Sequence, residues 1–229
     1  MASSASRWET FRLQRQFDAE LRTNVVRIAA VGLLYTLHLL HHFSAGGKFA
    51  WLDFQGFNFL GLDDGAAVPE KTHLALTFIA LAWATVAMII HLALASRIFP
   101  PGLMYASTLA DVGFLTAVLV FTSGAASPLV AVYLLIIAMA GLRLQLSLVR
   151  CATLAAMFGY LTVLGCRTLG VAGDLAARTP AVPRYYQLMF LATLAIAGIV
   201  AGQSIRHVRR LVDGPLADGP ETSEEAPQP

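Results

Sequence analysis

The sequence predicts an all-α integral membrane protein in which six transmembrane helices form a bundle. It contains six apolar runs of about 20 residues, the length of helix that crosses the ~30 Å hydrocarbon core of a bilayer. Hydrophobic residues make up 57% of the 229 residues and charged residues only 13%, which is unlike a soluble domain. A helix is the structure expected for such runs, because it satisfies every backbone polar group inside the lipid. The runs cover residues 24–43, 73–95, 104–122, 128–148, 151–169 and 185–205.

The chain before the first run predicts a cytoplasmic amphipathic helix at residues 1–22. Aromatic side chains such as Trp8 and Phe11 alternate there with basic ones such as Arg12 and Arg15, a pattern typical of helices that lie on a membrane surface. A cleaved signal peptide would place an apolar core of about 7–15 residues close to the first residue. More than 20 mostly polar and charged residues come first instead, so no signal peptide is expected.

Two further regions complete the expected organisation. Residues 23–211 form the six-helix transmembrane domain, which includes an external aromatic loop at residues 44–72. Residues 212–229 are rich in Pro, Gly, Glu and Asp and contain no apolar stripe, so they are expected to be a disordered cytoplasmic tail.

The basic residues indicate how the bundle is oriented. Six spans place both ends of the chain on one side, and that side carries eleven of the 16 Lys and Arg residues. These eleven are Arg7, Arg12, Arg15, Arg22, Arg27, Arg97, Arg143, Arg150, Arg206, Arg209 and Arg210. The positive-inside rule therefore predicts cytoplasmic termini, in a bacterial inner membrane. Since these residues lie at helix ends, the net charge of +2 does not indicate nucleic-acid binding.

The loop at residues 44–72 combines a high density of aromatic residues with acidic ones. Trp51 lies among four phenylalanines between Phe49 and Phe59. One interpretation is an interfacial segment whose rings rest at the level of the lipid headgroups. The other is a lid over a pocket at the outer ends of the helices, or a docking surface for a partner, with Trp51 as a ligand-binding residue.

Three histidines are candidates for a metal site near the outer face. His38 and His42 lie one helical turn apart near the end of the first run, and His73 opens the second run on the same side. Three imidazoles are a ligand set suited to zinc or copper. Haem ligated by histidines of two facing helices is a further alternative. The alternative to both is that these histidines pack at the interface and bind nothing.

Asp111 lies inside the third run, where an ionised carboxylate is costly unless it is paired. Arg143, Arg27 and His91 fall in the same inner half of the membrane. A structural ion pair or a protonated, hydrogen-bonded carboxyl is expected, and a ligand-binding or proton-coupled role stays open. No second buried acid is expected.

Several segments resemble the membrane input domain of bacterial sensor histidine kinases of the RegB and PilS type. The resemblance rests on LADVGFLTAVLVFTSG, the turn GAASP, LVAVYLLIIAMAGL and the arginine-rich exit AGIVAGQSIRHVRRL, and it covers residues 20–211. It implies a six-helix sensory domain. A kinase domain is not expected in the given sequence, because only 19 largely polar residues follow Arg210.

The same resemblance implies quinone as a candidate ligand. In those domains a turn commonly spelled Gly-Gly-x-x-Asn-Pro-Phe is associated with quinone sensing in the redox-responsive members. Here Gly124 and Pro128 match that turn, whereas Ser127 and Leu129 replace Asn and Phe. A ligand is expected near Gly124, Ser127 and Pro128, beneath the aromatic loop.

The expected function is a non-catalytic sensor or input module that binds a small hydrophobic ligand and signals to a partner. The sequence contains no phosphate-binding motif, and we do not expect an enzyme. One alternative is an accessory structural subunit of a larger respiratory or photosynthetic complex, and another is a metal or haem redox protein. Besides the lipid bilayer, the expected partners are a second copy or other membrane subunits, because Ala195, Gly198 and Gly202 form a small-residue face.

Overall fold

The computed structural model of the chain describes residues 4–45, 70–96, 102–170 and 181–213. Within these ranges every regular element is a helix and no strand occurs, which confirms the predicted all-α class. The elements are α1 (Ser4–Ala45), α2 (Glu70–Ala95), α3 (Leu103–Phe121), the 3₁₀ turns η1 (Gly124–Ala126) and η2 (Pro128–Ala131), α4 (Val132–Leu142), α5 (Leu146–Thr168) and α7 (Arg184–Asp213).

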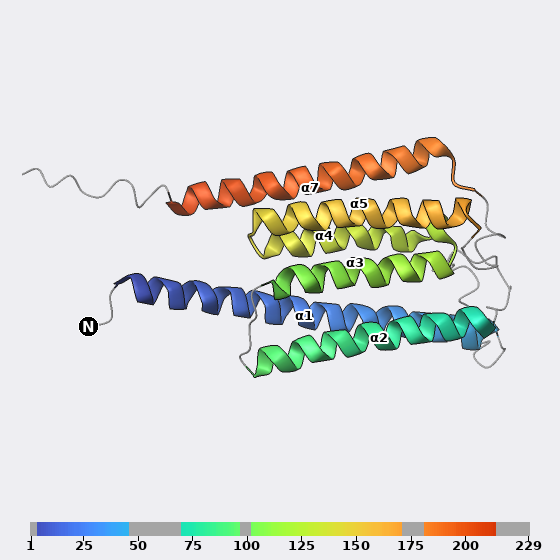
Figure 1. The fold of residues 1–229 in the computed structure, drawn as a ribbon, viewed down its shortest axis with the longest axis horizontal. Coiled ribbons are helices and arrows are strands. Elements are labelled where there is room, and N and C mark those ends of the chain that lie inside the picture. The colour runs from blue at the N-terminus through green and yellow to red at the C-terminus, as the bar shows by residue number, and fades with distance from the viewer. Residues whose placement is uncertain (1–3, 46–69, 97–101, 171–180, 214–229) are drawn as a thin grey trace, which may run out of the picture.

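The helices run along one common direction and alternate in polarity (Figure 1). Helix α2 packs against both α1 and α3, and α5 packs against α3, α4 and α7. As a result α1 lies at one edge of the bundle and is joined to it mainly through α2. Helix α1 begins and α7 ends at the same end of the bundle (Figure 1), which we call the inner end. The opposite end is called the outer end.

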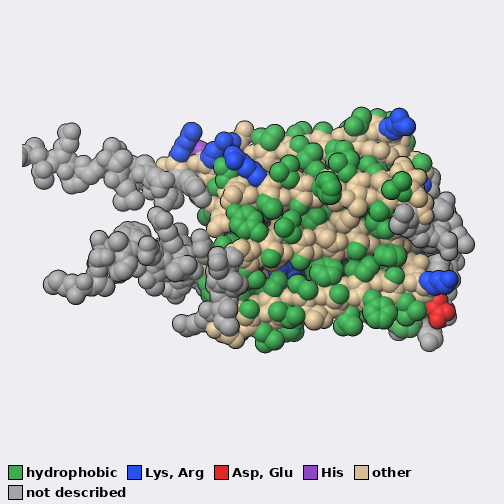
Figure 2. All heavy atoms as spheres, in the orientation of Figure 1, with side chains coloured by type: hydrophobic (Ala, Val, Ile, Leu, Met, Phe, Trp, Pro, Cys, Tyr) green, Lys and Arg blue, Asp and Glu red, His purple; other side chains and the backbone are tan. Residues whose placement is uncertain are grey.

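Five of the helices in the described ranges are long and apolar enough to span a membrane. The five segments are Glu20–Leu40, Glu70–Ala95, Leu103–Phe121, Leu146–Thr168 and Arg184–Val208, and Pro128–Leu142 is a shorter apolar segment. Hydrophobic side chains cover the middle of the visible surface, whereas Lys and Arg side chains gather at its ends (Figure 2). This surface indicates a multi-pass membrane protein whose helices contact lipid.

Helix α1 differs from the expectation for residues 1–22. It is one continuous helix of 42 residues, about 63 Å long at 1.5 Å per residue, and its first part extends beyond the bundle (Figure 1). The segment is therefore not a separate helix that turns to lie on the membrane. The sequence explains this: no proline occurs between Ser4 and Ala45 and only one glycine does, so nothing bends the helix.

The fourth run is also shorter than expected. Its helical part ends at Leu142 rather than at residue 148, and α5 begins at Leu146 rather than at residue 151. The tight turn between them places Leu144 in the left-handed region, with φ of 53°. Leucines on both sides of this turn made it look apolar in sequence, and the strained backbone of one leucine was not visible there.

Helices α5 and α7 approach closely at Gly198. A Cβ atom at this position would overlap the side chain of Thr153 on α5. One turn later, Gly202 faces Leu146, at the start of α5. The small-residue face of α7 is thus occupied by α5 of the same chain, and it is not an open surface for a homodimer.

Candidate functional site

Asp111 is the centre of a buried polar cluster between α1, α2 and α3. Only 3% of Asp111 and 2% of Arg27 are exposed. The Arg27 Nε–H group donates to both carboxylate oxygens of Asp111, at 2.7 and 2.9 Å. The Trp83 Nε1–H group donates to Oδ1 at 3.0 Å. The expected buried ion pair is therefore present, and of the three residues named for the same inner half it is Arg27 that makes it.

The cluster continues from Arg27 to the backbone of α2. Arg27 Nη1 donates to Asn24 Oδ1 at 2.6 Å, and Asn24 Nδ2 donates to the carbonyl oxygen of Ala87 at 3.1 Å. Asn24 is fully buried. Three helices are thereby connected in one hydrogen-bonded layer, since α1 supplies Arg27 and Asn24, α2 supplies Trp83 and Ala87, and α3 supplies Asp111.

A second buried ion pair lies nearer the inner end, between Glu20 and Arg143. Arg143 Nη2 and Glu20 Oε1 are 3.0 Å apart, and Glu20 is fully buried. Ser107 Oγ also donates to Glu20 Oε1, at 3.2 Å. Arg143 Nη1 donates to Thr108 Oγ1 at 2.9 Å and to the carbonyl oxygen of Met104 at 3.1 Å. Arg143 thus lies in a buried polar site as expected, but its acidic partner is Glu20.

Glu20 corrects two expectations from the sequence. The sequence predicts that residues 1–22 lie on the surface and that the bundle contains no second buried acid, whereas Glu20 is fully buried. The missed signal is the spacing of Glu20, Asn24 and Arg27, which are separated by four and three residues and so share one helical face. A polar stripe that enters an apolar run indicates a buried polar partner on another helix. This stripe runs past residue 22, where the surface helix was expected to end.

Three polar atoms of the two ion pairs are buried without a hydrogen bond to any described residue. They are Glu20 Oε2, Arg27 Nη2 and Arg143 Nε. A buried ion pair stabilises a fold only when its remaining donors and acceptors are also satisfied. These three atoms add to the cost of burying the two pairs.

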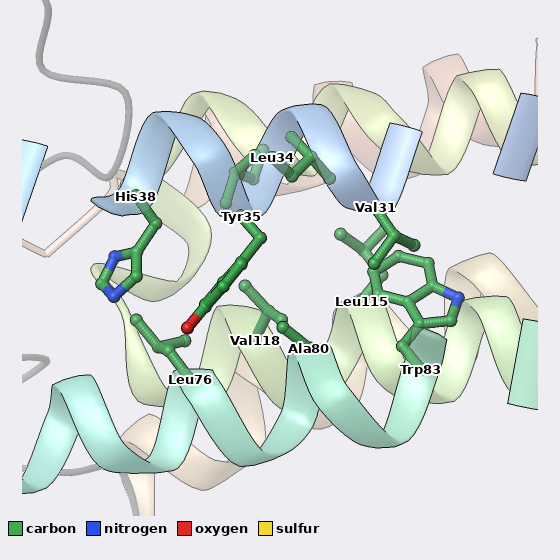
Figure 3. Close-up of a pocket in the computed structure, with 10 residues that line it drawn as sticks. Val31, Leu34, Tyr35, His38, Leu76, Ala80, Trp83, Leu115 and Val118 are labelled. Atoms are coloured by element: carbon green, nitrogen blue, oxygen red, sulfur yellow. The ribbon is translucent and has the colours of Figure 1, made fainter. Parts of the chain in front are cut away.

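An apolar cavity lies between α1, α2 and α3, with Trp83 at one end of it (Figure 3). Its volume is about 50 Å³. The lining residues are Val31, Leu34, Tyr35, His38, Leu76, Ala80, Trp83, Leu115, Val118 and Leu129. His38 and Trp83 lie at opposite ends in the view of Figure 3, with Tyr35 and the aliphatic side chains between them. The Trp83 ring forms one end of the cavity while its N–H group bonds to Asp111.

A histidine pair lies at the outer end of this cavity. His38 Nε2 and His73 Nδ1 are 3.0 Å apart, a hydrogen-bond distance, and the ring centroids are 5.2 Å apart. His38 is 4% exposed. A second link between α1 and α2 runs from the Tyr35 hydroxyl to Thr77 Oγ1, at 3.4 Å. The outer end of the cavity is therefore held by two polar links between α1 and α2.

The predicted metal site is only partly visible. His38 and His73 lie together, whereas the side chain of His42 is outside the described part of the chain. Among the side chains that are described, no group of three His, Cys, Asp or Glu residues is placed to hold a metal ion. The two rings are in direct contact, so this arrangement has no space for a haem iron between them. The metal site stays a prediction.

The turn at residues 124–128, which was predicted to bind ligand, positions a residue that lines the cavity. Ser127 Oγ accepts a hydrogen bond from the backbone N–H of Leu129 at 3.2 Å, and Leu129 lines the cavity. Gly124 has a φ of 65° and faces Val163 of α5. Gly124, Ser127 and Pro128 do not line the cavity themselves. Trp51 and the aromatic loop lie outside the described residues.

No protein-family model matches the chain, and neither curated proteins nor solved structures gave a match. The resemblance to sensor-kinase input domains therefore rests on the sequence motifs alone.

Proposed function

We propose that the chain is a membrane sensor or input module that binds a small hydrophobic ligand in the cavity between α1, α2 and α3. One observation carries this proposal: the Trp83 ring lines one end of an apolar cavity while its N–H group bonds to a buried, charged residue. Pockets for small molecules are mostly apolar with a few placed polar groups. Here the polar groups are His38 and Tyr35, at the outer end.

The lining favours a flat, mainly apolar ring that carries an oxygen acceptor. Tyr35 and Trp83 supply aromatic surfaces, against which a ring can stack. The His38–His73 pair can donate a hydrogen bond from a ring N–H group. A quinone has this chemistry, which agrees with the resemblance of the turn that contains Gly124 and Ser127. In this proposal the turn shapes the cavity through Leu129.

Binding can be followed by the fluorescence of Trp83. With Trp8→Phe and Trp51→Phe in the same chain, Trp83 is the one remaining tryptophan. Decylubiquinone should quench it with a saturable dependence on concentration. Ala80→Phe fills the cavity and should abolish the saturable component, whereas Ala82→Phe on the exposed face of α2 should leave it unchanged. Equal quenching in these two variants would mean that the quinone does not use the cavity.

We further propose that the chain crosses a bacterial inner membrane six times, with both termini in the cytoplasm. The support is the distribution of Lys and Arg in the sequence and the positions of the ends of α1 and α7 (Figure 1). Reporter fusions after residue 60 should be external, and fusions after residue 215 should be cytoplasmic. An external reporter at residue 215 would require a different number of spans.

A signalling role also needs a partner. Helices α1 and α7 both extend past the other helices at the inner end (Figure 1), where a cytoplasmic partner could contact them. Purification in mild detergent separates the two main alternatives, because a sensor should elute alone or as a homodimer. Stable co-purification with fixed subunits would favour the accessory-subunit function instead.

A further inference from the structure

We propose that the ion pairs Arg27–Asp111 and Glu20–Arg143 form a latch, which opens when a ligand displaces Trp83 and so frees the inner half of α1 to move. The inference rests on the proposed function, because it needs a ligand in the cavity. It adds how ligand binding would be signalled, namely by a movement of α1 that reaches the part of this helix outside the membrane.

Trp83 is the physical connection between the cavity and the latch. Its ring is part of the cavity wall, and its Nε1–H group is one of the donors that hold the Asp111 carboxylate. The ring also stacks on Phe114 of α3, with centroids 5.8 Å apart and an interplanar angle of 17°. A ligand that fills the end of the cavity next to Trp83 must press on this ring. Moving the ring removes a hydrogen bond from a buried charge, which raises the free energy of the closed latch.

The latch is the main polar attachment of the inner half of α1 to the rest of the bundle. Helix α1 packs along α2, and its described polar links to α3 and to the end of α4 are made by Arg27 and Glu20. Both are buried, so their interactions are screened little by water. The position of this half of α1 therefore depends on whether the two pairs are intact.

The incomplete hydrogen bonding of both pairs makes a second state accessible. Glu20 Oε2, Arg27 Nη2 and Arg143 Nε are buried without a described partner. A fully satisfied network would resist rearrangement, whereas a partly satisfied one is held by a small net free energy. A modest binding energy in the cavity can then shift the balance between closed and open states.

The shape of α1 carries the movement out of the membrane. Glu20 and Arg27 belong to the same unbroken helix as residues 4–19, which extend past the bundle at the inner end (Figure 1). A tilt or shift of the helix at Glu20 therefore also moves residues 4–19. A partner that contacts this part of α1 would detect the state of the cavity.

The first test needs no ligand. Spin labels are placed at Arg22→Cys on α1 and Arg150→Cys on α5, both exposed, after Cys151 and Cys166 are replaced by Ser. Distances are measured by pulsed electron paramagnetic resonance on the full chain in lipid nanodiscs. Trp83→Phe keeps an aromatic ring and removes the N–H donor.

Trp83→Phe should broaden or shift the distance distribution in the same direction as Asp111→Asn. Leu76→Ala is the matched control, because it enlarges the cavity without touching either ion pair, and it should leave the distribution unchanged. A Trp83→Phe distribution identical to that of the wild type would overturn the latch, whether or not Asp111→Asn shifts it.

The second test uses the reciprocity of coupled sites. If binding opens the latch, a variant that weakens the latch should bind the ligand more tightly, because less of the binding free energy is needed for opening. Glu20→Gln lies outside the cavity and should raise the affinity for decylubiquinone about fivefold or more. Ser147→Ala, which removes an inner-end hydrogen bond to Tyr105 outside the latch, should not change it. Equal affinities in wild type and Glu20→Gln would overturn the coupling. If no variant shows saturable quenching, the proposed function is overturned, and the first test then decides whether the latch exists.

Discussion

The inner and outer halves of the contact between α1, α2 and α3 are built on opposite principles. In the inner half, Arg27, Asp111 and Asn24 make short, directional hydrogen bonds that define the closed arrangement of the helices. In the outer half, aliphatic side chains leave a cavity of about 50 Å³, and the His38–His73 pair joins the helices at its end. Charge complementarity therefore sets the geometry on one side, and loose packing leaves room for adjustment on the other.

Removing Asp111 should have the largest effect, because it leaves Arg27 charged and buried without a partner. Asp111→Leu is expected to lower the free energy of unfolding by about 3–5 kcal/mol, and Asp111→Asn should cost less because it keeps hydrogen-bonding atoms. Thermal unfolding in detergent measures both. The double variant Arg27→Met with Asp111→Leu should recover most of the loss. Equal melting temperatures for wild type, Asp111→Leu and Asp111→Asn would contradict a buried ion pair.

The pair nearer the inner end should have an intermediate effect. A double-mutant cycle with Glu20→Gln and Arg143→Gln is expected to give a coupling energy of about 1.5–3 kcal/mol, the range for hydrogen bonds between charged groups. The same detergent unfolding experiment measures it. A coupling energy near zero would show that the two side chains do not interact across α1 and α4.

The smallest effect is expected in the outer half. His38→Leu removes one hydrogen bond from a mainly apolar contact, which should cost about 1 kcal/mol. His91→Leu is a useful control, because His91 lies on α2 outside the pair. If His38→Leu destabilised the protein as much as Asp111→Leu, the outer half would be as firmly fixed as the inner half and the comparison would fail.

The sequence predicted the parts of this molecule that depend on composition and length. The apolar runs identified α2, α3, α5 and α7, because lipid imposes a minimum length on each helix. The majority of the helix ends lie within a few residues of the predicted ones. The position of Asp111 inside an apolar run predicted that it is buried, because an unpaired charge is costly in lipid. Helix class and buried polarity are local properties of the chain.

The pairing of side chains could not be predicted in the same way. Asp111 had several basic candidates at similar depth, and only the packing of the three helices, in which α2 contacts both α1 and α3, brings Arg27 to it. Glu20 lies before the first apolar run, so the sequence pattern assigns it to the surface segment. The cavity depends on how Trp83, Tyr35 and Leu115 fit together, which is a property of three helices and of no single segment.

The contact at Gly198 has a consequence for how this protein can move. The Thr153 side chain occupies the space that a side chain at position 198 of α7 would need. The close packing of α7 on α5 therefore requires glycine at this position. Sliding α7 towards the inner end by about one turn would bring Ala195 of the same face against Thr153, where a Cβ atom overlaps the threonine side chain. Movement of α7 towards the inner end is therefore sterically opposed unless α5 moves with it.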